Sequence, residues 1–489
     1  MDAPADSTVL LTPPPGCPNV AEPPANPGLD QEVAHINRWR RRNAYYYAQL
    51  HRLFKLHIPP GSRVLEVGCG LGDLLADLAP SRGVGIESKP REARLAAQRF
   101  PHLDIVCADY TSFELDETFD YVIVSNALTE MEDIQAMFER VQAVCRPDTR
   151  LVVAYFNGLW EPLLKLAALA GQRASVPDMN WLDMADVVNL LDLADFEVVR
   201  RSSEILLPKY VPLLSTFLNR FCCRFWPLTR LPLVYLFVAR PRRAPENAER
   251  LTCSVVIPTH NERGNIRAAI ERTPEMGAGT ELIFVDGNSN DGTAEEIEQQ
   301  IARHPDRPIR LLHQGSGRGK GDAVRQGFAA ARGDVLMILD ADLTVAPEDL
   351  PKFFHAVTSG GGEFINGTRL VYPLEKQAMR FLNKCGNRFF STVFTWLLNQ
   401  RFRDTLCGTK VLLRRNYQRI VSGRSYFGDF DPFGDFDLIF GAARLNLRIL
   451  EIPVRYGART YGETSINRFR DGLLLLRMSW VAFRKLKTR

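Results

Sequence analysis

The sequence predicts an α/β protein with two domains, each built around a parallel sheet. At 489 residues, the chain is longer than one hydrophobic core usually supports. Short apolar runs alternate with amphipathic segments in both halves, as in strand–helix–strand units. A polar, proline-containing segment, ARPRRAPENAER at 239–250, separates the halves and is expected to be a linker.

The elements of the N-terminal half follow a proline-rich arm, residues 1–30, which is expected to be disordered. Ordered structure is expected from 31 to 240 and opens with a helix in NRWRRRNAYYYAQLHRLFKL. Strands are expected at 63–67, 83–87, 104–108 and 119–124, with a helix at 73–78 after a glycine-rich loop. A further strand starts at Leu151, and residues 233–241 are expected to close the sheet.

The C-terminal half restarts after a linker at 241–251. Strands are predicted in SVVIPTHNE (254–262), ELIFVD (281–286), IRLLHQ (309–314) and VLMIL (335–339), with a helix at 321–333. This domain is expected to span 252–470. Residues 471–489 predict a basic amphipathic helix, in which Leu473, Leu476, Trp480 and Phe483 recur at helical spacing. Such a helix either lies on a membrane surface or docks on the core.

Composition favours a globular cytoplasmic protein. The chain is 45% hydrophobic and 24% charged with a net charge of +4, a weak excess that does not predict nucleic-acid binding. The helix near the N-terminus interleaves cations and aromatics, as some nucleic-acid-binding segments do, but a solvated helix with its aromatics facing the core is favoured. Scattered cysteines indicate a reducing compartment, and no signal-peptide pattern is present. No uncharged apolar run approaches the ~18 residues of a membrane span, so the protein is expected to be soluble or peripheral, on the inner face of the membrane.

The buried run Val335 to Leu339 ends on two carboxylates, Asp340 and Asp342. An isolated pair of this kind is usually a polar strand end. Here other strand ends in the same half also carry polar loops, PTHNE, VDGNSNDGT and GSGRGKGDA, and ligands of parallel sheets bind at carboxyl ends. Two such carboxylates suit Mg²⁺ or Mn²⁺ bridged to a diphosphate, with Lys320 as a nearby cation.

Further motifs follow in order: LDADL (339–343), NGTR (366–369), DTLCGTK (404–410) and EIPVRYGARTYGETS (451–465). The ordered set resembles glycosyltransferase family 2, which has the GT-A fold, and above all polyprenyl- (dolichyl-) phosphate glucosyl- and mannosyltransferases. The resemblance implies inverting transfer of a single sugar from a UDP- or GDP-sugar to a polyprenyl phosphate. Gly287 departs from relatives that carry a second acid there, and the Q-x-x-R-W motif of processive members is absent.

The same resemblance implies roles for individual residues. Pro258 and Glu262 would contact the nucleotide, Asp286 the base, Asp340 and Asp342 the metal with help from Thr344, and Arg369, Arg380 and Arg459 the phosphates. Guanidinium groups match phosphate bidentately, although one isolated arginine is equally often a solvated surface charge. Apart from the resemblance, FGDFDPFGDFD (427–437) offers four aspartates, of which one, with Asp435 as the candidate, could orient or deprotonate the acceptor. The spacing does not single one out, and turn formation accounts better for most of these four, which are Asp429, Asp431, Asp435 and Asp437.

In the N-terminal half, RVLEVGCGLGDLL places glycines between a strand and a helix, and GVGIE ends the next strand on Glu87. NAD sites share this layout. The continuation, ADY (108–110) and FDYVIVSNALTEMED (119–133), resembles class I S-adenosylmethionine-dependent methyltransferases, which have a Rossmann-like fold. This implies that Glu66, Gly68, Gly70 and Gly72 line the methionine end of S-adenosylmethionine. Glu87 would bind the ribose, Asp109 the adenine, and Asn126 would lie near the cofactor.

The sequence therefore predicts a bifunctional, multidomain transferase, with one alternative left open. In that alternative the glycosyltransferase acts on a soluble glycan or glycolipid, and the methyltransferase-like domain is a non-catalytic regulatory or partner-binding module. The segments FNGLWEPLLKLAALAG (156–171) and 204–238 are either an acceptor pocket or simply the closing elements of the fold.

Overall fold

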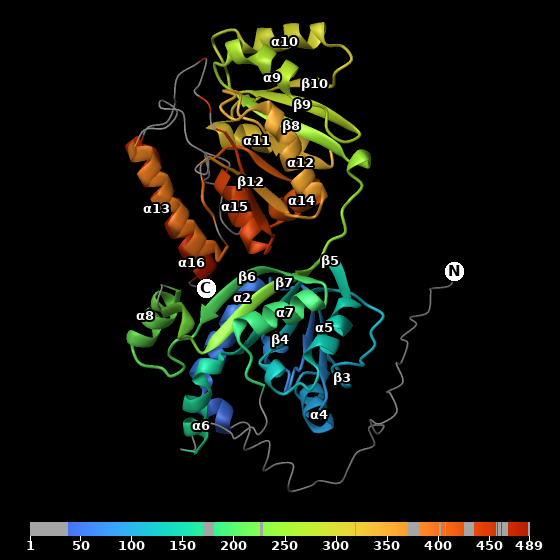
Figure 1. Ribbon diagram of the computed structural model, residues 1–489, viewed down its shortest axis with the longest axis vertical. Coiled ribbons are helices and arrows are strands. Elements are labelled where there is room, and N and C mark those ends of the chain that lie inside the picture. The colour runs from blue at the N-terminus through green and yellow to red at the C-terminus, as the bar shows by residue number, and fades with distance from the viewer. Residues whose placement is uncertain are drawn as a thin grey trace, which may run out of the picture. The chain divides into compact units, whose positions relative to one another are not determined.

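The computed structural model describes residues 38–169, 180–224, 228–317, 319–369, 381–400, 402–405, 407–424, 435–455, 457, 461 and 468–487. The chain divides into two compact units, residues 1–241 and 242–489 (Figure 1). The predicted arm, residues 1–30, lies outside the described residues. Part of the predicted linker forms a short 3₁₀ helix, Ala248–Arg250.

The N-terminal unit contains a seven-stranded sheet in the order β3-β2-β1-β4-β5-β7-β6. Its strands are β1 Arg63–Val67, β2 Arg82–Glu87, β3 Asp104–Cys107, β4 Phe119–Ser125, β5 Cys145–Phe156, β6 Phe196–Glu204 and β7 Val234–Pro241. Strands β1 to β5 pair in parallel, whereas β7 is antiparallel to both β5 and β6.

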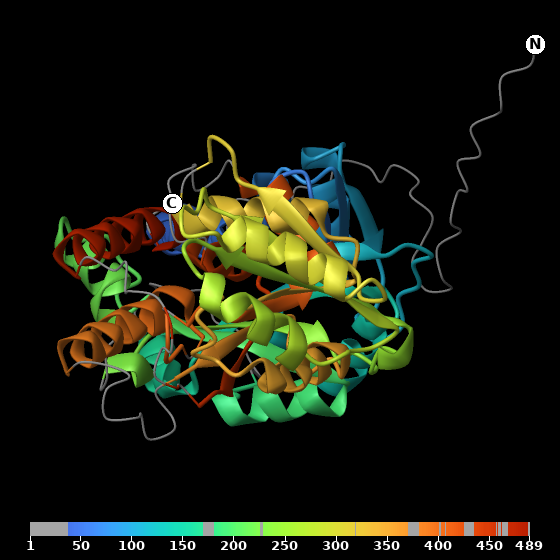
Figure 2. The same cartoon turned by 90° about the horizontal axis from the view of Figure 1, so that it is seen from above.

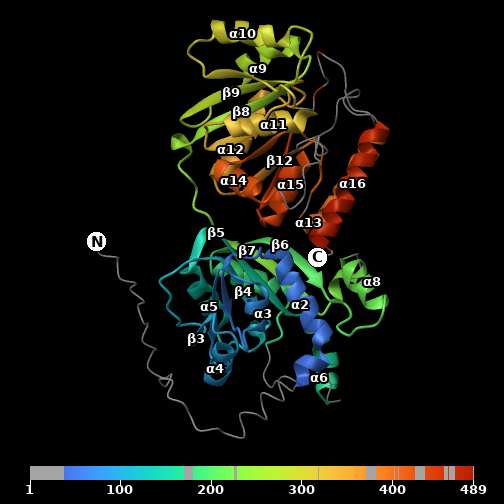
Figure 3. The same cartoon turned by 180° about the vertical axis from the view of Figure 1, so that it is seen from behind.

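Helices cover both faces of this sheet (Figures 1 and 3). They are α2 Ala44–His57, α3 Asp73–Asp77, α4 Pro90–Arg99, α5 Ile134–Gln142, α6 Glu161–Leu169, α7 Met184–Leu193 and α8 Leu214–Arg220. Strand residues alternate between two cores, because successive side chains point to opposite faces. Leu65 and Val67 pack with α5 and α7, while Val64 packs with α2 and α3.

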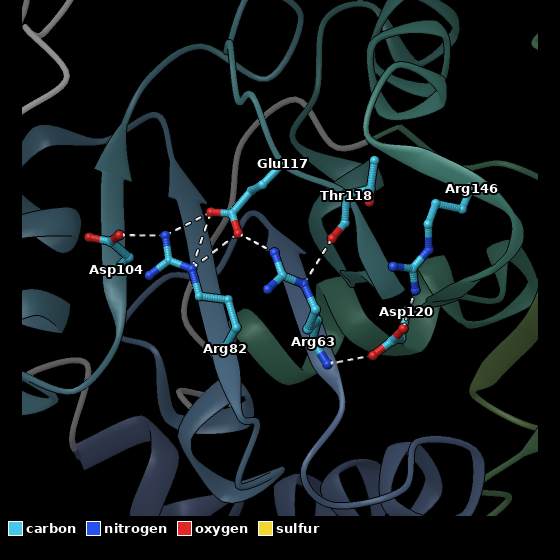
Figure 4. Close-up of polar contacts among 7 residues, drawn as sticks. All are labelled: Arg63, Arg82, Asp104, Glu117, Thr118, Asp120 and Arg146. Atoms are coloured by element: carbon cyan, nitrogen blue, oxygen red, sulfur yellow. Dashed lines mark hydrogen bonds and ion pairs between the residues drawn. The ribbon is translucent and has the colours of Figure 1, made fainter. Parts of the chain in front are cut away.

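Charged side chains tie together the amino ends of the parallel strands, at the edge opposite the polar loops (Figure 4). Glu117 accepts hydrogen bonds from Arg63 and Arg82, at 2.6 Å and 2.7 Å, and Arg82 also reaches Asp104 at 2.8 Å. The Arg82 hydrogen bond leads the causes that lower the pKa of Glu117. The network therefore holds the amino ends of the strands together, and the predicted site residues lie at the opposite, carboxyl edge.

The C-terminal unit contains a second seven-stranded sheet, in the order β10-β9-β8-β11-β13-β12-β14. Its strands are β8 Thr252–Thr259, β9 Gly279–Asp286, β10 Ile309–His313, β11 Val335–Ile338, β12 Phe364–Thr368, β13 Lys410–Leu413 and β14 Ile449–Pro453. Strand β13 is antiparallel to β11 and β12, and the other pairs are parallel.

The predicted parallel pairing is present for most strands, but each sheet also contains one antiparallel strand, so both sheets are mixed. Residues 233–241 were expected to close the first sheet, but β7 lies between β5 and β6. All eight residues of β7 are buried, as in a central strand. The edge strand β6, FEVVRRSSE, was not predicted, since its charged and polar residues weaken the apolar pattern of a strand.

Two sets of helices cover the second sheet. The set α9 Ile266–Arg272, α10 Thr293–Arg303 and α12 Leu350–Thr358 packs on one core. The other core is covered by α11 Gly319–Ala330, α13 Phe381–Leu398, α14 Arg414–Ser422, α15 Asp435–Arg444 and α16 Arg468–Lys487. In Figure 2 the orange α13 and the red α16 run along the same side of this unit.

The C-terminal helix, α16, divides its apolar residues between two faces. Met478 and Ala482 are buried in the core, and Phe483 stacks on Trp396 of α13 with ring centroids 5.6 Å apart. Leu473, Leu476 and Trp480 are exposed instead. The predicted single stripe thus separates into a docked face and an exposed face. Within the described residues, no helix is long and apolar enough to cross a membrane.

Candidate active sites

Three parallel strands bring the predicted donor-site residues of the C-terminal unit to one edge. Thr259 of β8 pairs with Asp286 of β9, and Ile338 of β11 pairs with Val256 of β8. The carboxyl ends of β8, β9 and β11 therefore lie side by side. The predicted site residues lie at or just beyond these ends, where parallel α/β sheets bind their ligands. They are Pro258, Glu262, Asp286, Asp340 and Asp342.

The two carboxylates after β11 have different surroundings. Asp340 forms an ion pair with Lys320, on the first turn of α11, with 2.5 Å between Oδ1 and Nζ. Asp342 Oδ1 accepts hydrogen bonds from the backbone N–H and hydroxyl of Thr344, at 3.1 Å and 2.8 Å. The turn orients Asp342, while a cation holds Asp340.

Positive charge surrounds Asp340. Burial opposes ionisation of this carboxyl, but Lys320, Lys410 and Arg369 outweigh it and lower its pKa below the usual value. Lys410 is fully buried at the start of β13 and donates to the Cys407 carbonyl. Sequence analysis assigned Lys410 no role; its place in DTLCGTK, beside the predicted site motifs, was the available signal. The cationic cluster suits a diphosphate.

The pair also fits a divalent cation. Gly408 leaves room for the carboxylate, because a Cβ there would overlap both Asp340 and Lys320. The oxygens of Asp340 and Asp342 are hard donors of the kind that Mg²⁺ and Mn²⁺ prefer. Among the described residues no three or more metal-ligating side chains cluster, and a bound diphosphate and water would supply further oxygen ligands.

The other predicted donor contacts are held by local hydrogen bonds. Asp286 is 3% exposed and accepts from the Ser289 hydroxyl at 2.5 Å. Glu262 is also buried, and its Oε2 accepts from the side-chain amide of Asn265 at 2.7 Å. Both acids therefore shape the loops after their strands, and their predicted nucleotide contacts stay predictions.

The predicted phosphate ligands are placed unevenly. Arg369 follows β12, and its guanidinium makes a bidentate pair with Asp404, at 2.7 Å through Nε and 2.9 Å through Nη2. In this structure the guanidinium nitrogens of Arg369 that would bind a phosphate are hydrogen-bonded to the carboxylate of Asp404. Arg380 and Arg459 lie outside the described residues. Asp435 begins α15, but its side chain is not among those described.

The Arg369–Asp404 pair supports a stability prediction. Asp404→Asn is expected to lower the stability of this unit by about 3 to 5 kcal/mol, because a buried guanidinium loses its charged partner. Glu348→Gln breaks the pair that Glu348 forms with Arg272, which is exposed, and is expected to cost under ~1 kcal/mol. Pulse proteolysis in urea, followed on fragments of this unit, measures both. Equal losses would contradict a structural role for Asp404.

In the N-terminal unit, a glycine loop joins β1 to α3. Gly68, Gly70 and Gly72 have φ angles of 77°, 53° and 76°, a region that other residues adopt only with strain. The Glu87 carboxylate, at the end of β2, accepts from the backbone N–H of Gly70 at 2.8 Å and from the Tyr110 hydroxyl at 3.0 Å. Glu87 thus links the loop to the two neighbouring strands, and its predicted ribose contact stays a prediction.

Gly68 offers a test of how tightly this loop is packed. A Cβ on Gly68 would lie 2.5 Å from the Cβ of Ala127, whereas Gly61, with the same φ of 77°, has nothing within 4 Å. Gly61→Ala is expected to cost about 1 kcal/mol from backbone strain alone. Gly68→Ala should cost about 2 kcal/mol more, because the clash must be relieved. Urea unfolding measures the difference, and equal costs would show that the loop yields freely.

Two buried oxygens near this loop lack hydrogen-bond partners among the described residues. They are Glu66 Oε2 on β1 and Asn126 Oδ1, directly after β4. Strands β1 and β4 are paired neighbours in the sheet. Glu66 and Asn126 therefore both lie at the carboxyl edge of the sheet. Burial is the first cause that raises the pKa of Glu66, to about 8. Unsatisfied buried acceptors are costly, and a bound group with N–H donors would satisfy them.

The remaining predicted residue, Asp109, lies just beyond β3 and is exposed. Its Oδ1 accepts from the backbone N–H of Thr111 at 2.8 Å, and bonds with Thr111 lower its pKa. Tyr46 of α2 adds a contact that sequence analysis missed. Its hydroxyl accepts from the Asn126 amide at 2.9 Å, so the amino-terminal helix covers the same edge of the sheet.

Comparison with known protein families assigns both units. A model described as "Glycosyl transferase family 2" matches residues 254–418, and a model described as "Methyltransferase domain" matches residues 38–201. The chain joins a methyltransferase domain to a family 2 glycosyltransferase domain. Together with the two seven-stranded sheets, this confirms the predicted fold class, two Rossmann-like α/β domains, one for each of these families.

Two curated relatives are dolichol-phosphate mannosyltransferases. The dolichol-phosphate mannosyltransferase of Saccharomyces cerevisiae is 40% identical over 117 residues, 22% of this chain and 43% of that protein. The dolichol-phosphate mannosyltransferase of Pyrococcus furiosus is 32% identical over 219 residues, 44% of this chain and 58% of that protein. The chain thus spans about half the length of these relatives.

One solved structure aligns with less than half of the chain. It is an S-adenosylmethionine-dependent methyltransferase of Thermotoga maritima, described as a possible histamine N-methyltransferase. The match covers 43% of this chain and 97% of that one, at 14% identity and a TM-score of 0.34.

Proposed function

We propose that the chain is a bifunctional enzyme. The glycosyltransferase domain moves one sugar from a UDP- or GDP-sugar to a polyprenyl phosphate with inversion, and the methyltransferase domain methylates a second acceptor with S-adenosylmethionine. The observation that carries the first activity is the Asp340–Asp342 pair at the end of β11, set among Lys320, Lys410 and Arg369. The names of the relatives support the acceptor class.

The proposed sugar transfer is a single displacement. An acceptor phosphate oxygen forms a bond to the anomeric carbon on the face opposite the nucleoside diphosphate, and the bond to that diphosphate breaks. Because the phosphate is already anionic near neutral pH, no strong general base is required. Lys320 would neutralise charge that develops on the leaving diphosphate, and Asp340 and Asp342 would hold the cation. A bound Mg²⁺ or Mn²⁺ would supply Lewis-acid stabilisation of that charge.

S-Adenosylmethionine fits the residues of the methyltransferase domain. The glycine loop allows close backbone approach, and the unpaired oxygens of Glu66 and Asn126 can accept hydrogen bonds from an ammonium group. The chain's own contribution would be to hold the cofactor at the carboxyl edge of β1 and β4. The methyl group, when the cofactor is bound, comes from its sulfonium.

Radiolabelled transfer tests the proposal. Full-length protein is incubated with a polyprenyl phosphate, a panel of UDP- and GDP-sugars, and Mg²⁺ or Mn²⁺. Labelled lipid product with one donor is the expected result. Labelling of a soluble glycan or glycolipid alone would favour the alternative acceptor. Failure of the same protein to bind S-adenosylmethionine would leave the methyltransferase domain a regulatory or partner-binding module.

The proposed location is the cytoplasmic side, at the inner face of the membrane.

A further inference from the structure

Two long insertions leave the methyltransferase sheet at its carboxyl edge. One follows β5 and contains α6; the other, residues 205–233, joins β6 to β7 and contains α8. Val234 of β7 pairs with Phe156 of β5 and with Glu204 of β6, so both insertions start at the same edge. Ser125 of β4 pairs with Ala154 of β5, which places the cofactor-side Asn126 at that edge too.

These insertions expose large apolar side chains. Leu163 and Leu166 of α6 are 55% and 61% exposed, and Phe217 of α8 is 57% exposed. Apart from Leu193, every exposed large hydrophobic side chain described in this unit lies in the two insertions. Figures 1 and 3 place α6 and α8 on the same side of the unit. A concentrated apolar surface of this kind marks an interaction site.

Helix α8 is inverted relative to an ordinary surface helix. Its polar residues Ser215 and Asn219, four apart, are buried, and its apolar residues Leu214 and Phe217, three apart, are exposed. The inner contacts are specific, because the Asn219 side chain exchanges two hydrogen bonds with the backbone of Leu207, at 2.8 Å and 2.9 Å. A helix that hydrogen-bonds inward and turns its apolar face outward favours a non-aqueous medium outside.

The turn before α8 adds to this surface. Leu213 is 87% exposed and has a φ of 62°, a conformation that costs a leucine free energy. The insertion is also anchored to the segment that directly precedes α6. The Trp160 indole donates to the Leu231 carbonyl at 2.6 Å, and the Asn157 amide donates to the Pro232 carbonyl at 2.8 Å. The exposed apolar groups therefore project from a fixed scaffold.

The charged residues of the second insertion have one sign, whereas the first insertion contains the ion pair Glu161–Lys165, with 2.6 Å between its charged atoms. Residues 205–233 contain Lys209, Arg220, Arg224 and Arg230 and no acidic residue. Lys209 donates to the Arg42 carbonyl at 3.2 Å, which joins the insertion to the basic sequence RWRRR (38–42). Apolar groups surrounded by cations complement the headgroups and acyl boundary of an anionic bilayer. A protein partner would meet no acidic groups to pair with in this segment.

We propose that the described residues of the two insertions, 157–169, 205–224 and 228–233, form a docking surface for an anionic lipid bilayer. Docking would bring the carboxyl edge of the methyltransferase sheet against the membrane, so that its methyl acceptor is a membrane-borne molecule. The proposal deepens the function proposed for the methyltransferase domain but rests on this surface alone. The protein can bind lipid even if it transfers no sugar, and it can transfer sugar even if it binds no lipid. The two proposals can therefore be tested separately.

Vesicle flotation of the full-length protein tests the surface. Wild type is expected to float with phosphatidylcholine vesicles that contain phosphatidylglycerol, less so with phosphatidylcholine alone, and less at high salt. Phe217→Glu should bind the anionic vesicles about tenfold more weakly. Leu193→Glu is the matched control: Leu193 is 55% exposed at the end of α7, at the amino end of β6, and its variant should float like wild type. Equal flotation of all three proteins would overturn the proposal.

Hydrogen exchange separates this surface from α16, which also exposes leucines. On adding the anionic vesicles, amides of 207–221 are expected to gain protection. Protection confined to 468–487 would overturn the proposal and assign lipid binding to the glycosyltransferase domain. A change in the sedimentation of Phe217→Glu without vesicles would also overturn it, by showing a contact between copies of the chain. Sugar transfer by Phe217→Glu to a short-chain acceptor in detergent should equal that of wild type.

Discussion

Asp342→Asn is expected to reduce sugar transfer about a thousandfold while leaving the glycosyltransferase domain folded. The amide keeps an Oδ1 that can accept the two Thr344 hydrogen bonds, so the turn after β11 is preserved. What disappears is a negative oxygen donor for the cation that would neutralise the leaving diphosphate. Losses of about this size follow removal of one group that stabilises transition-state charge.

The matched control for this variant is Asp349→Asn. Asp349 lies on the same stretch of chain and pairs with Lys352 rather than facing the strand end, so its variant should retain full activity. Two measurements apply: the initial rate of lipid labelling, and the binding of Mn²⁺ followed by electron paramagnetic resonance with a nucleoside diphosphate present. Asp342→Asn should lose both. Transfer within tenfold of wild type would remove the pair from the proposed mechanism.

The Lys320–Asp340 contact explains why the metal test includes a nucleotide. With 2.5 Å between their charged atoms, the lysine occupies one carboxylate oxygen that the cation would need. A diphosphate competes for the same ammonium group, because it carries more negative charge than one carboxylate. Metal affinity is therefore expected to be weak for the protein alone and strong with the diphosphate, and Mn²⁺ binding of equal strength in both states would contradict this coupling.

The sequence predicted the features that depend on local pattern. The apolar run before Asp340 indicated a buried strand, and the glycines before Asp73 indicated a strand–loop–helix unit; both elements are present as β11 and β1–α3. The carboxyl-edge placement of the acids follows from parallel pairing alone. These inferences need only a few neighbouring residues and the general rules of α/β folds.

Features that depend on long-range contacts were not predictable in the same way. The antiparallel insertion of β7 and β13 depends on pairing partners far along the chain. The pair that Arg369 forms with Asp404, 35 residues away in sequence, was not predicted, and the phosphate contact of Arg369 stays a prediction. Phe483 was assigned to the same stripe as Leu473, but packing against Trp396 leaves Phe483 half-buried while Leu473 is exposed. In each case a tertiary contact decided the outcome.

S-Adenosylmethionine affinity is expected to rise about tenfold per pH unit between pH 6 and 8. In the ligand-free protein, burial raises the pKa of Glu66 to about 8 from 4.5, and repulsion by Glu87 adds to this, against Arg40 and a backbone N–H bond. Glu66 is therefore protonated at neutral pH. An ammonium group favours the ionised carboxylate, so binding releases one proton below pH 8.

The same group gives the ligand-free protein an opposite pH dependence of stability. Because the folded-state pKa lies above the unfolded value, the folded protein binds the extra proton between about pH 4.5 and 8. The free energy of unfolding should therefore fall by up to ~1.4 kcal/mol per pH unit as pH rises through this window. Saturating cofactor should remove most of this slope, since it compensates the buried charge.

Equilibrium dialysis at pH 6, 7 and 8 measures the affinity, and urea unfolding at the same pH values measures the stability. Glu66→Gln removes the titrating group, so both slopes should flatten and affinity at pH 8 should fall at least about tenfold. Glu114→Gln, at a side chain that is 88% exposed, should leave both slopes unchanged. An affinity independent of pH in wild type would mean that Glu66 does not meet the cofactor's ammonium group. A stability slope that persists without an affinity slope would confine Glu66 to the fold, because only a direct contact with the cation ties the same proton to both equilibria.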